Sequence, residues 1–299
     1  MIAEEVAWTA LMGPVAFLEA RGFDLYEWQD FTYNLPRQPL MIVACRQAGK
    51  TFLAAGKAYN IGSSEANTES AVVCPDQDKG KKVIERIGDI KLRDPGTPAF
   101  DPDNTEMVGF PWSGSTIKAL PGTIKGIVSP TLKFLCFDEA NLLANALYIA
   151  ATPAQAHVDD PWTWALSSAW WKAGWFYDDW VKGTGGWTRI LVRAKWDIKD
   201  KKVVAYLPEA EFKAMWKEKG IHAFYSDYPT KEFLELELSR HPERWIRQQY
   251  FCEFQDLEGV VFTDDWITSA FTSDVQPLFS RKGGLDSSVH PLGILKDIK

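Results

Sequence analysis

The sequence has few cysteines, no long apolar run and no excess of positive charge, and each absence excludes a class of protein. The four cysteines among 299 residues (Cys45, Cys74, Cys136 and Cys252) form no CxxC pair, so zinc-finger spacing is absent and a reducing compartment is expected. No apolar run approaches the ~20 residues that span a bilayer, and acids stand where a signal peptide needs basic residues. A net charge of −7 excludes a protein that coats nucleic acid, although it is compatible with a local basic contact.

Short apolar runs alternate with helical patterns along the chain. The runs typical of buried strands cover residues 39–45, 70–75, 115–120, 132–137, 163–169 and 188–195. Helical patterns cover residues 51–61, 78–92, 140–151, 174–181, 207–219 and 231–254. This alternation predicts an α/β fold, with a mostly parallel central sheet flanked by helices on both faces.

A loop typical of phosphate binding follows the first apolar run. Residues 44–51 read ACRQAGKT and match the pattern GxxxxGK[ST], except that Ala44 replaces the first glycine. In such a loop, backbone N–H groups and the positive end of the next helix face phosphate oxygens. We predict that Lys50 reaches the β- and γ-phosphates of ATP and that Thr51 coordinates Mg²⁺. The other loop residues predicted to bind the nucleotide are Cys45, Arg46, Gln47, Ala48 and Gly49. An ordinary strand–turn–helix with a surface lysine is the alternative.

Two adjacent carboxylates, Asp138 and Glu139, follow the apolar run 132–137. Ligands of open α/β sheets bind at the carboxyl ends of the strands, so we expect this pair beside the phosphate loop. We predict that Asp138 holds Mg²⁺ and that Glu139 is the base that polarises the attacking water. A helix start that uses both acids only for capping is the alternative.

Three further residues complete the predicted nucleotide site. Arg46, inside the loop, is expected to contact the γ-phosphate and to act in catalysis with Lys50 and Glu139. Upstream, Trp28 is a candidate for stacking on adenine and Gln29 for hydrogen bonding to its edge. A helix with core aromatic residues explains that segment equally well.

These elements, in this order, resemble the large terminase subunit of tailed bacteriophages, a DNA-packaging motor. The matching segments are LYEWQ with Gln29, the loop RQAGKT, FLCFDEA at 134–140, and the stretches 167–177 and 245–262. The resemblance implies a P-loop NTPase fold of the additional-strand type with a small helical C-terminal subdomain. It also implies a Mg²⁺-dependent ATPase, with ATP and Mg²⁺ as its cofactors.

The resemblance assigns roles to further positions. Ser167 and Ser168 look like the coupling motif that senses the γ-phosphate, although the family commonly has proline where Ala169 stands. Lys125 stands where family members often carry an arginine that acts in trans on a neighbouring subunit. Asp286 resembles the first metal-binding acid of an RNase H-like nuclease. Because only thirteen residues follow it, we expect no nuclease activity from this chain.

From these matches we predict three parts. Residues 1–205 form the ATPase core, residues 206–279 a helical extension and linker, and residues 280–299 the first strand of a truncated nuclease domain.

The resemblance also implies partners: double-stranded DNA, the small terminase subunit and the portal protein, on which a homo-oligomeric ring forms in the host cytoplasm, away from any membrane. The most basic stretch, 78–93, is a candidate for tracking DNA phosphates, or else a solvated helix face. Two other functions fit the motifs. One is a helicase-like DNA translocase, which needs a second RecA-like domain. The other is a catalytically silent prophage remnant that acts as an assembly or DNA-binding protein.

Overall fold

A computed structural model of the chain describes residues 13–123 and 131–256. Its centre is an eight-stranded sheet in the order β10-β7-β1-β6-β5-β2-β4-β3. All neighbouring strands are parallel except β3, which is antiparallel to β4 at the edge. The predicted α/β fold with a mostly parallel sheet is therefore confirmed. The strands of this sheet are β1 (Leu40–Ala44), β2 (Glu69–Cys74), β3 (Met107–Phe110), β4 (Ser115–Pro121), β5 (Phe134–Asp138), β6 (Trp162–Ser167), β7 (Thr188–Ala194) and β10 (Ile221–Ser226).

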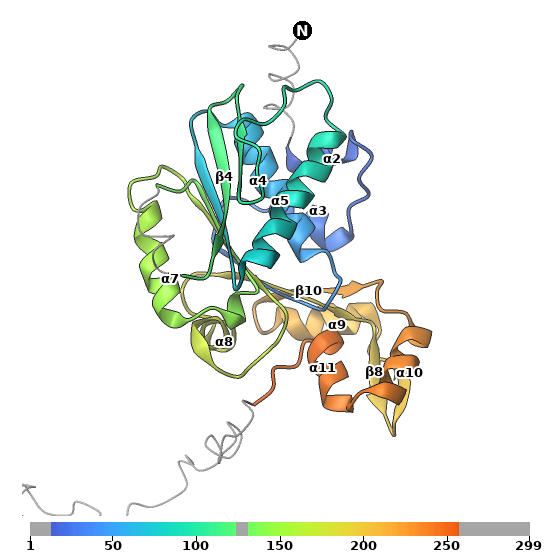
Figure 1. Cartoon of the computed structure of the whole chain (residues 1–299). Helices are drawn as coiled ribbons and strands as arrows, with labels where there is room; N and C mark the ends of the chain where they lie inside the picture. Colours follow the sequence, from blue (N-terminus) through green and yellow to red (C-terminus); the bar gives the residue numbers. More distant parts are fainter. Residues whose placement is uncertain (1–12, 124–130, 257–299) are drawn as a thin grey trace, which may run out of the picture. The chain divides into compact units, whose positions relative to one another are not determined.

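Helices cover both faces of the sheet (Figure 1). Successive residues of a strand point to opposite faces, and β1 is apolar on both. Leu40 and Ile42 belong to a core shared with α2 (Pro14–Glu19), α3 (Glu27–Asn34), α4 (Lys50–Ser64) and α5 (Gln77–Leu92). Met41 and Val43 belong to a core shared with α7 (Asn145–Ala151), α8 (Gly174–Lys182) and α9 (Glu209–Lys217). Burial on both faces explains why the strand reads as one continuous apolar run.

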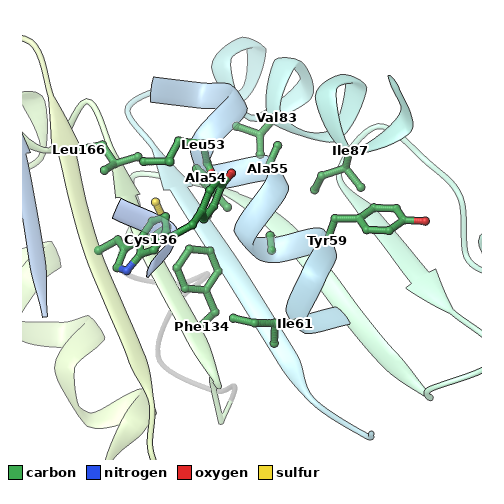
Figure 2. Close-up of a cluster of buried hydrophobic side chains, with 14 of the residues drawn as sticks. Leu53, Ala54, Ala55, Tyr59, Ile61, Val83, Ile87, Phe134, Cys136 and Leu166 are labelled. Atoms are coloured by element: carbon green, nitrogen blue, oxygen red, sulfur yellow. The ribbon is translucent and has the colours of Figure 1, made fainter. Parts of the chain in front are cut away.

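The helices α4 and α5 pack side by side on one face of the sheet, where both contact β2 and β4 (Figure 2). Its small residues Ala54 and Ala55 are fully buried, which lets the helix axis approach the strands closely. Leu53 and Tyr59 fill the remaining space against side chains of β5 and β6 and against Val83 and Ile87 of α5. This packing fixes the first turn of α4, which begins at Lys50, at the carboxyl edge of the sheet.

The structure differs from the sequence predictions in the last third of the described chain. The predicted helix 231–254 is two helices, α10 (Lys231–Arg240) and α11 (Glu243–Phe251). Pro242 is the N-cap of α11, because proline has no N–H to continue the preceding helix. The strand β10 was not predicted, yet it pairs with β7 in the central sheet. The predicted end of the core at residue 205 is therefore wrong, because the sheet includes residues 221–226.

A small subdomain lies beside β7 (Figure 1). It consists of α10, α11 and an unpredicted hairpin of β8 (Trp196–Lys199) and β9 (Lys202–Ala205). These elements share a core of their own, made of Ala194, Ile198, Val203, Leu234, Ile246, Tyr250 and Phe251. The predicted helical C-terminal subdomain is therefore present but also contains a hairpin. None of the helices described is long and apolar enough to cross a membrane.

Candidate nucleotide-binding site

Three strand ends meet at one edge of the sheet. The strand β6 lies between β1 and β5, the arrangement expected for the additional-strand type of P-loop fold. Val43 is in register with Ser167, and Asp138 is in register with Leu166. Because parallel strands place their carboxyl ends together, the loops after β1, β5 and β6 converge there. The sheet order alone therefore brings the predicted phosphate loop, acidic pair and coupling serines to one place.

The phosphate loop has a backbone that few residues adopt. Gln47 has φ +63° and Gly49 has φ +95°, both in the left-handed region. A Cβ at Gly49 would stand 2.7 Å from Nε2 of Gln29, so only glycine fits this position without displacing that amide. The first turn of α4 follows directly, and its N–H groups carry the positive end of the helix dipole. The local geometry is that of an anion-binding loop.

Lys50 is 8% exposed, and its charge is surrounded by oxygen atoms. Its Nζ donates to the carbonyls of Ala44 and Cys45 at 3.1 and 3.3 Å and to Oγ of Ser168 at 2.9 Å. The ammonium group thus joins the phosphate loop to the end of β6. Ser167, the other predicted coupling residue, is fully buried, and its Oγ accepts from the N–H of Asn141 at 3.2 Å.

Asp138 is only 4% exposed, at the end of β5. Its Oδ2 accepts a long hydrogen bond of 3.4 Å from the hydroxyl of Thr51. Burial, together with the neighbouring charge of Glu139, raises the pKa of Asp138 to about 6 despite the attraction of Lys50. The carboxylate and the hydroxyl, predicted as magnesium ligands, are therefore adjacent.

Glu139 has a constrained backbone and a well-held carboxylate. Its φ of +52° lies in the left-handed region, which a non-glycine residue adopts only where the surrounding structure imposes it. Its Oε2 accepts from the indole Nε1 of Trp170 at 3.0 Å and from the N–H of Ser168 at 3.3 Å. Burial raises the pKa of this carboxyl, but Lys50 and the Trp170 hydrogen bond outweigh burial and lower it. Glu139 is therefore held in the ionised form that a general base needs.

A cavity of about 400 Å³ lies over these groups. It is lined by Arg46, Gln47, Gly49, Lys50, Thr51, Phe52, Arg86 and Glu139. Arg46 is exposed to solvent, so its guanidinium can reach a ligand without moving a packed residue. The cavity is bounded by three cations and one carboxylate, a balance that suits a polyphosphate.

The backbone of the loop shows which N–H groups are already bonded within the protein. The N–H of Cys45 donates to the carbonyl of Val192 at 2.8 Å, and the N–H of Arg46 donates to the carbonyl of Gln249 at 2.8 Å. These two N–H groups are therefore already used by the protein, whereas the nucleotide-binding role predicted for the loop stays a prediction. Ala48 is buried with its N–H directed to the carbonyl of Cys45 at 3.4 Å.

The segment predicted to read adenine is only partly suited to that role. Trp28 is 2% exposed in the core, so its ring does not offer a face for a base, and the stacking prediction is wrong for this residue. Gln29 is equally buried, accepting from the N–H of Tyr26 at 3.1 Å and donating to the carbonyl of Gly49 at 3.3 Å. Tyr26, by contrast, is 47% exposed and lies next to Gly49. The accessible aromatic ring beside the loop is therefore Tyr26.

The basic helix α5 uses much of its charge locally. Lys81 pairs with Asp78 at 3.1 Å and Arg86 with Asp89 at 2.8 Å. Lys91 donates to the carbonyls of Asp94 and Thr97, which fixes the end of the helix. Of the exposed cations of α5, Lys82 and Arg86 line cavities next to Thr51. Lys125 and Asp286 lie outside the residues that the structure describes.

Several residues at the site had no predicted role. Trp170 contacts Glu139, and Asn141 accepts from the N–H groups of Trp170 and Trp171 at 3.1 and 2.7 Å. Arg86, predicted only as part of a basic stretch, lines the same cavity as Lys50 and Glu139. The sequence signal available for Asn141 was its place three residues after Asp138. No sequence pattern pointed to Gln249, which reaches the loop from α11.

Comparison with known proteins shows the fold. No family model matches the sequence. No curated protein matches it either. Solved structures do match it. The large terminase ATPase domain of Thermus phage P74-26 is 16% identical to this chain, with a TM-score of 0.58. The match covers 80% of this chain and 98% of that chain. The HK97 bacteriophage large terminase is 15% identical, with a TM-score of 0.57, 78% of this chain and 51% of that chain covered.

A third structure is a large terminase from a thermophilic bacteriophage in complex with ADP. It is 11% identical, with a TM-score of 0.51, 73% of this chain and 48% of that chain covered. The chain thus spans about half the length of this large terminase and of the HK97 one. Its described part has the P-loop fold of the ATPase domain of phage large terminases.

Proposed function

We propose that this chain is an ATP-hydrolysing motor subunit that moves double-stranded DNA into a viral procapsid. The observation that carries the proposal is the meeting of Lys50, Ser168, Asp138 and Glu139 at one edge of the sheet, over a cationic cavity. A lysine for the phosphates, a carboxylate that can hold Mg²⁺ and a second carboxylate for the attacking water are groups that enzymes use for phosphoryl transfer to water. The likeness in fold to terminase ATPase domains directs the proposal to packaging.

Each charged group has a role in the proposed reaction. Lys50 and Arg46 neutralise charge that develops on the transferred phosphoryl group. Glu139 accepts a proton from the attacking water, and its hydrogen bonds from Trp170 and Ser168 keep its carboxylate aimed into the cavity. Lys125 is the proposed trans-acting residue of a neighbouring subunit.

The donor atoms at the site suit magnesium. Thr51 offers a hydroxyl and Asp138 a carboxylate, and both are hard oxygen donors of the kind that Mg²⁺ prefers. The described residues contain no cluster of three or more His, Cys, Asp or Glu side chains that would hold a metal ion without help from a substrate. Thr51 and Asp138 would therefore hold the ion together with ATP phosphates and water, and the ion would neutralise phosphate charge.

The proposed partners follow from the same fold. Double-stranded DNA is the cargo, and the exposed Lys82 and the half-buried Lys79 of α5 are the proposed contact with its phosphates. A homo-oligomeric ring on a portal protein, with a small terminase subunit that delivers DNA, is the proposed assembly.

The test is ATP hydrolysis by the purified chain with and without duplex DNA. We expect Mg²⁺-dependent hydrolysis that rises when duplex DNA, portal protein or small subunit is added. Hydrolysis that is accompanied by strand separation would replace packaging with a helicase-like function. Absence of hydrolysis under all these conditions would refute the ATPase proposal and leave a silent assembly protein.

A further inference from the structure

Trp170 is the side chain beyond the predicted site that contacts the proposed base directly. Its indole Nε1 lies 3.0 Å from Oε2 of Glu139. Several other tryptophans, among them Trp162, Trp164 and Trp175, leave the indole N–H buried without a hydrogen-bond partner in the described structure. The N–H of Trp170 is instead directed at a carboxylate, which makes the bond charge-assisted and stronger than a neutral one.

The backbone of Trp170 is fixed by Asn141. The amide oxygen of Asn141 accepts from the N–H groups of Trp170 and Trp171, and its Nδ2 donates to the carbonyls of Trp171 and Ala173, both at 3.2 Å. Four bonds use the full capacity of one asparagine amide, two donated and two accepted. Because Asn141 follows Glu139 by two residues, these bonds join the acidic loop and the segment after β6 into one hydrogen-bonded piece.

The carbonyl of Trp170 connects this piece to α11. It accepts from Nε2 of Gln248 at 2.8 Å and from the N–H of Gln255 at 3.0 Å. Gln248 is 6% exposed, so its amide is shielded from solvent, and its oxygen accepts from Nε2 of Gln249 at 3.3 Å. The helix α11 therefore contacts Trp170, and Trp170 in turn donates a hydrogen bond to Glu139.

The same helix also holds the phosphate loop. The carbonyl of Gln249 lies in the last turn of α11, where carbonyls have no partner within the helix. It accepts from the N–H of Arg46. Two successive residues of α11 thus reach the two sides of the nucleotide cavity, one through a side chain and one through the backbone.

We propose that Trp170 is a positioning residue that sets the place of the Glu139 carboxylate and ties it, through Gln248, to α11. This inference rests on the proposed function, since it gives Glu139 the task of a base. A displacement of α11 shifts Trp170 and the phosphate loop together, so the hydrolytic step and the position of the small subdomain are coupled.

The test compares Trp170→Phe with Trp171→Phe in the full chain. Phenylalanine keeps an aromatic ring at position 170 but removes the N–H donor. We expect kcat for ATP hydrolysis to fall about tenfold in Trp170→Phe while KM and the affinity for ATPγS stay within about twofold, because a lost hydrogen bond to an ionised group is worth about that factor. Trp171→Phe, which alters the adjacent ring but no contact with Glu139, is expected to keep kcat.

A double-mutant cycle separates positioning from structure. In a Glu139→Gln background, Trp170→Phe is expected to lower kcat no further, because the base whose position Trp170 sets is already lost. Gln248→Met, which leaves Glu139 and its donor in place, is expected to lower kcat with KM unchanged, and it serves as the test if Trp170→Phe does not fold.

The outcomes separate the two proposals. A wild-type chain that binds ATP without hydrolysing it overturns the proposed function and this role with it. A wild-type chain that hydrolyses ATP, with Trp170→Phe equally active or with equal losses in both backgrounds, overturns the positioning role alone.

Discussion

Two buried lysines on one helix, Lys50 and Lys57, have opposite surroundings. Both are in α4, and they are 8% and 4% exposed. Lys50, at the carboxyl edge of the sheet, donates to three oxygen atoms. The Nζ of Lys57 lies 3.4 Å from the centre of the Trp162 ring and has no hydrogen bond within the described residues. One helix therefore buries a charge among acceptors at one end and against an aromatic face further along.

The surroundings decide what each charge does to the fold. Burial, helped by the nearby positive charge of Arg37, lowers the pKa of Lys57 to about 7. Glu65 attracts Lys57 but is also paired with Arg37 at 3.6 Å and Lys133 at 3.1 Å. A cation–π contact recovers only part of the lost hydration. The comparison of Lys50 with Lys57 teaches that burial of a cation does not by itself indicate a ligand site. Oxygen acceptors and carboxylates must also lie around it.

The largest expected effect distinguishes the two lysines in function. Lys50→Met should lower ATP turnover by at least about a hundredfold and weaken nucleotide binding, because the phosphate charge loses its central cation. Lys57→Met should leave both unchanged. Turnover and the affinity for ATPγS are the measurements. Equal losses in the two variants would show that α4 as a whole, and not the carboxyl edge, carries the activity.

A carboxylate at the same edge should limit stability. The folded pKa of Asp138 is about 6, above its usual 3.8, so between these pH values the folded chain binds more protons and the free energy of unfolding falls as pH rises. At pH 7, Asp138→Asn should therefore raise the free energy of unfolding of the ligand-free protein by about 1 to 3 kcal/mol. Turnover should be lost at the same time.

Thermal unfolding without nucleotide, with Thr163→Ala as a control on a neighbouring strand, measures this effect. A lower melting temperature in Asp138→Asn would mean that the carboxylate stabilises the fold, contrary to its burial.

Lys57 should give a pH effect of opposite sign. The unfolded chain holds a proton on this lysine up to about pH 10.5 and the folded chain only up to about 7, so stability rises with pH in between. Lys57→Met should stabilise the fold by about 1 to 3 kcal/mol at pH 7, and the gap to wild type should narrow by up to about 1.4 kcal/mol per pH unit above pH 7.

Urea unfolding of both proteins at pH 6, 7 and 8.5 tests this prediction. The difference between the two chains is the relevant quantity, because the buried cysteines titrate equally in both. If the difference in unfolding free energy between the two chains does not change with pH, Lys57 keeps its proton in the folded state over this pH range.

The smallest expected effect concerns the binding of the adenine ring. Tyr26→Ala should weaken ATP binding about two- to tenfold, since an exposed ring beside Gly49 supplies stacking of modest strength. Tyr26→Phe should keep the affinity of the wild type. An unchanged affinity for ATP in Tyr26→Ala would mean that the adenine ring binds at another part of the site.

The sequence predicted the parts of the site that depend on chain order. A glycine-lysine-threonine loop after a buried strand, and two acids after another, are local patterns, and the parallel sheet places them together. Trp28 was misjudged because an aromatic residue on a helix reads alike whether it faces the core or the solvent. Strand β10 was missed because IHAFYS carries a histidine and a serine, and its pairing with β7 depends on contacts distant in sequence.

The contacts that α11 makes with the site could not be predicted from the sequence either. Gln248 and Gln249 look like ordinary polar helix residues, and only the tertiary structure turns one amide toward Trp170 and one carbonyl toward Arg46. The break between α10 and α11 at Pro242 could have been read from the proline itself.

ATP hydrolysis by the wild-type chain and by Glu139→Gln, with bound ATP measured in both, tests the central claim most directly. The account predicts that wild type hydrolyses Mg²⁺-ATP, and that Glu139→Gln binds ATP as tightly but turns it over about 10²- to 10⁴-fold more slowly. Wild-type turnover in Glu139→Gln would contradict it.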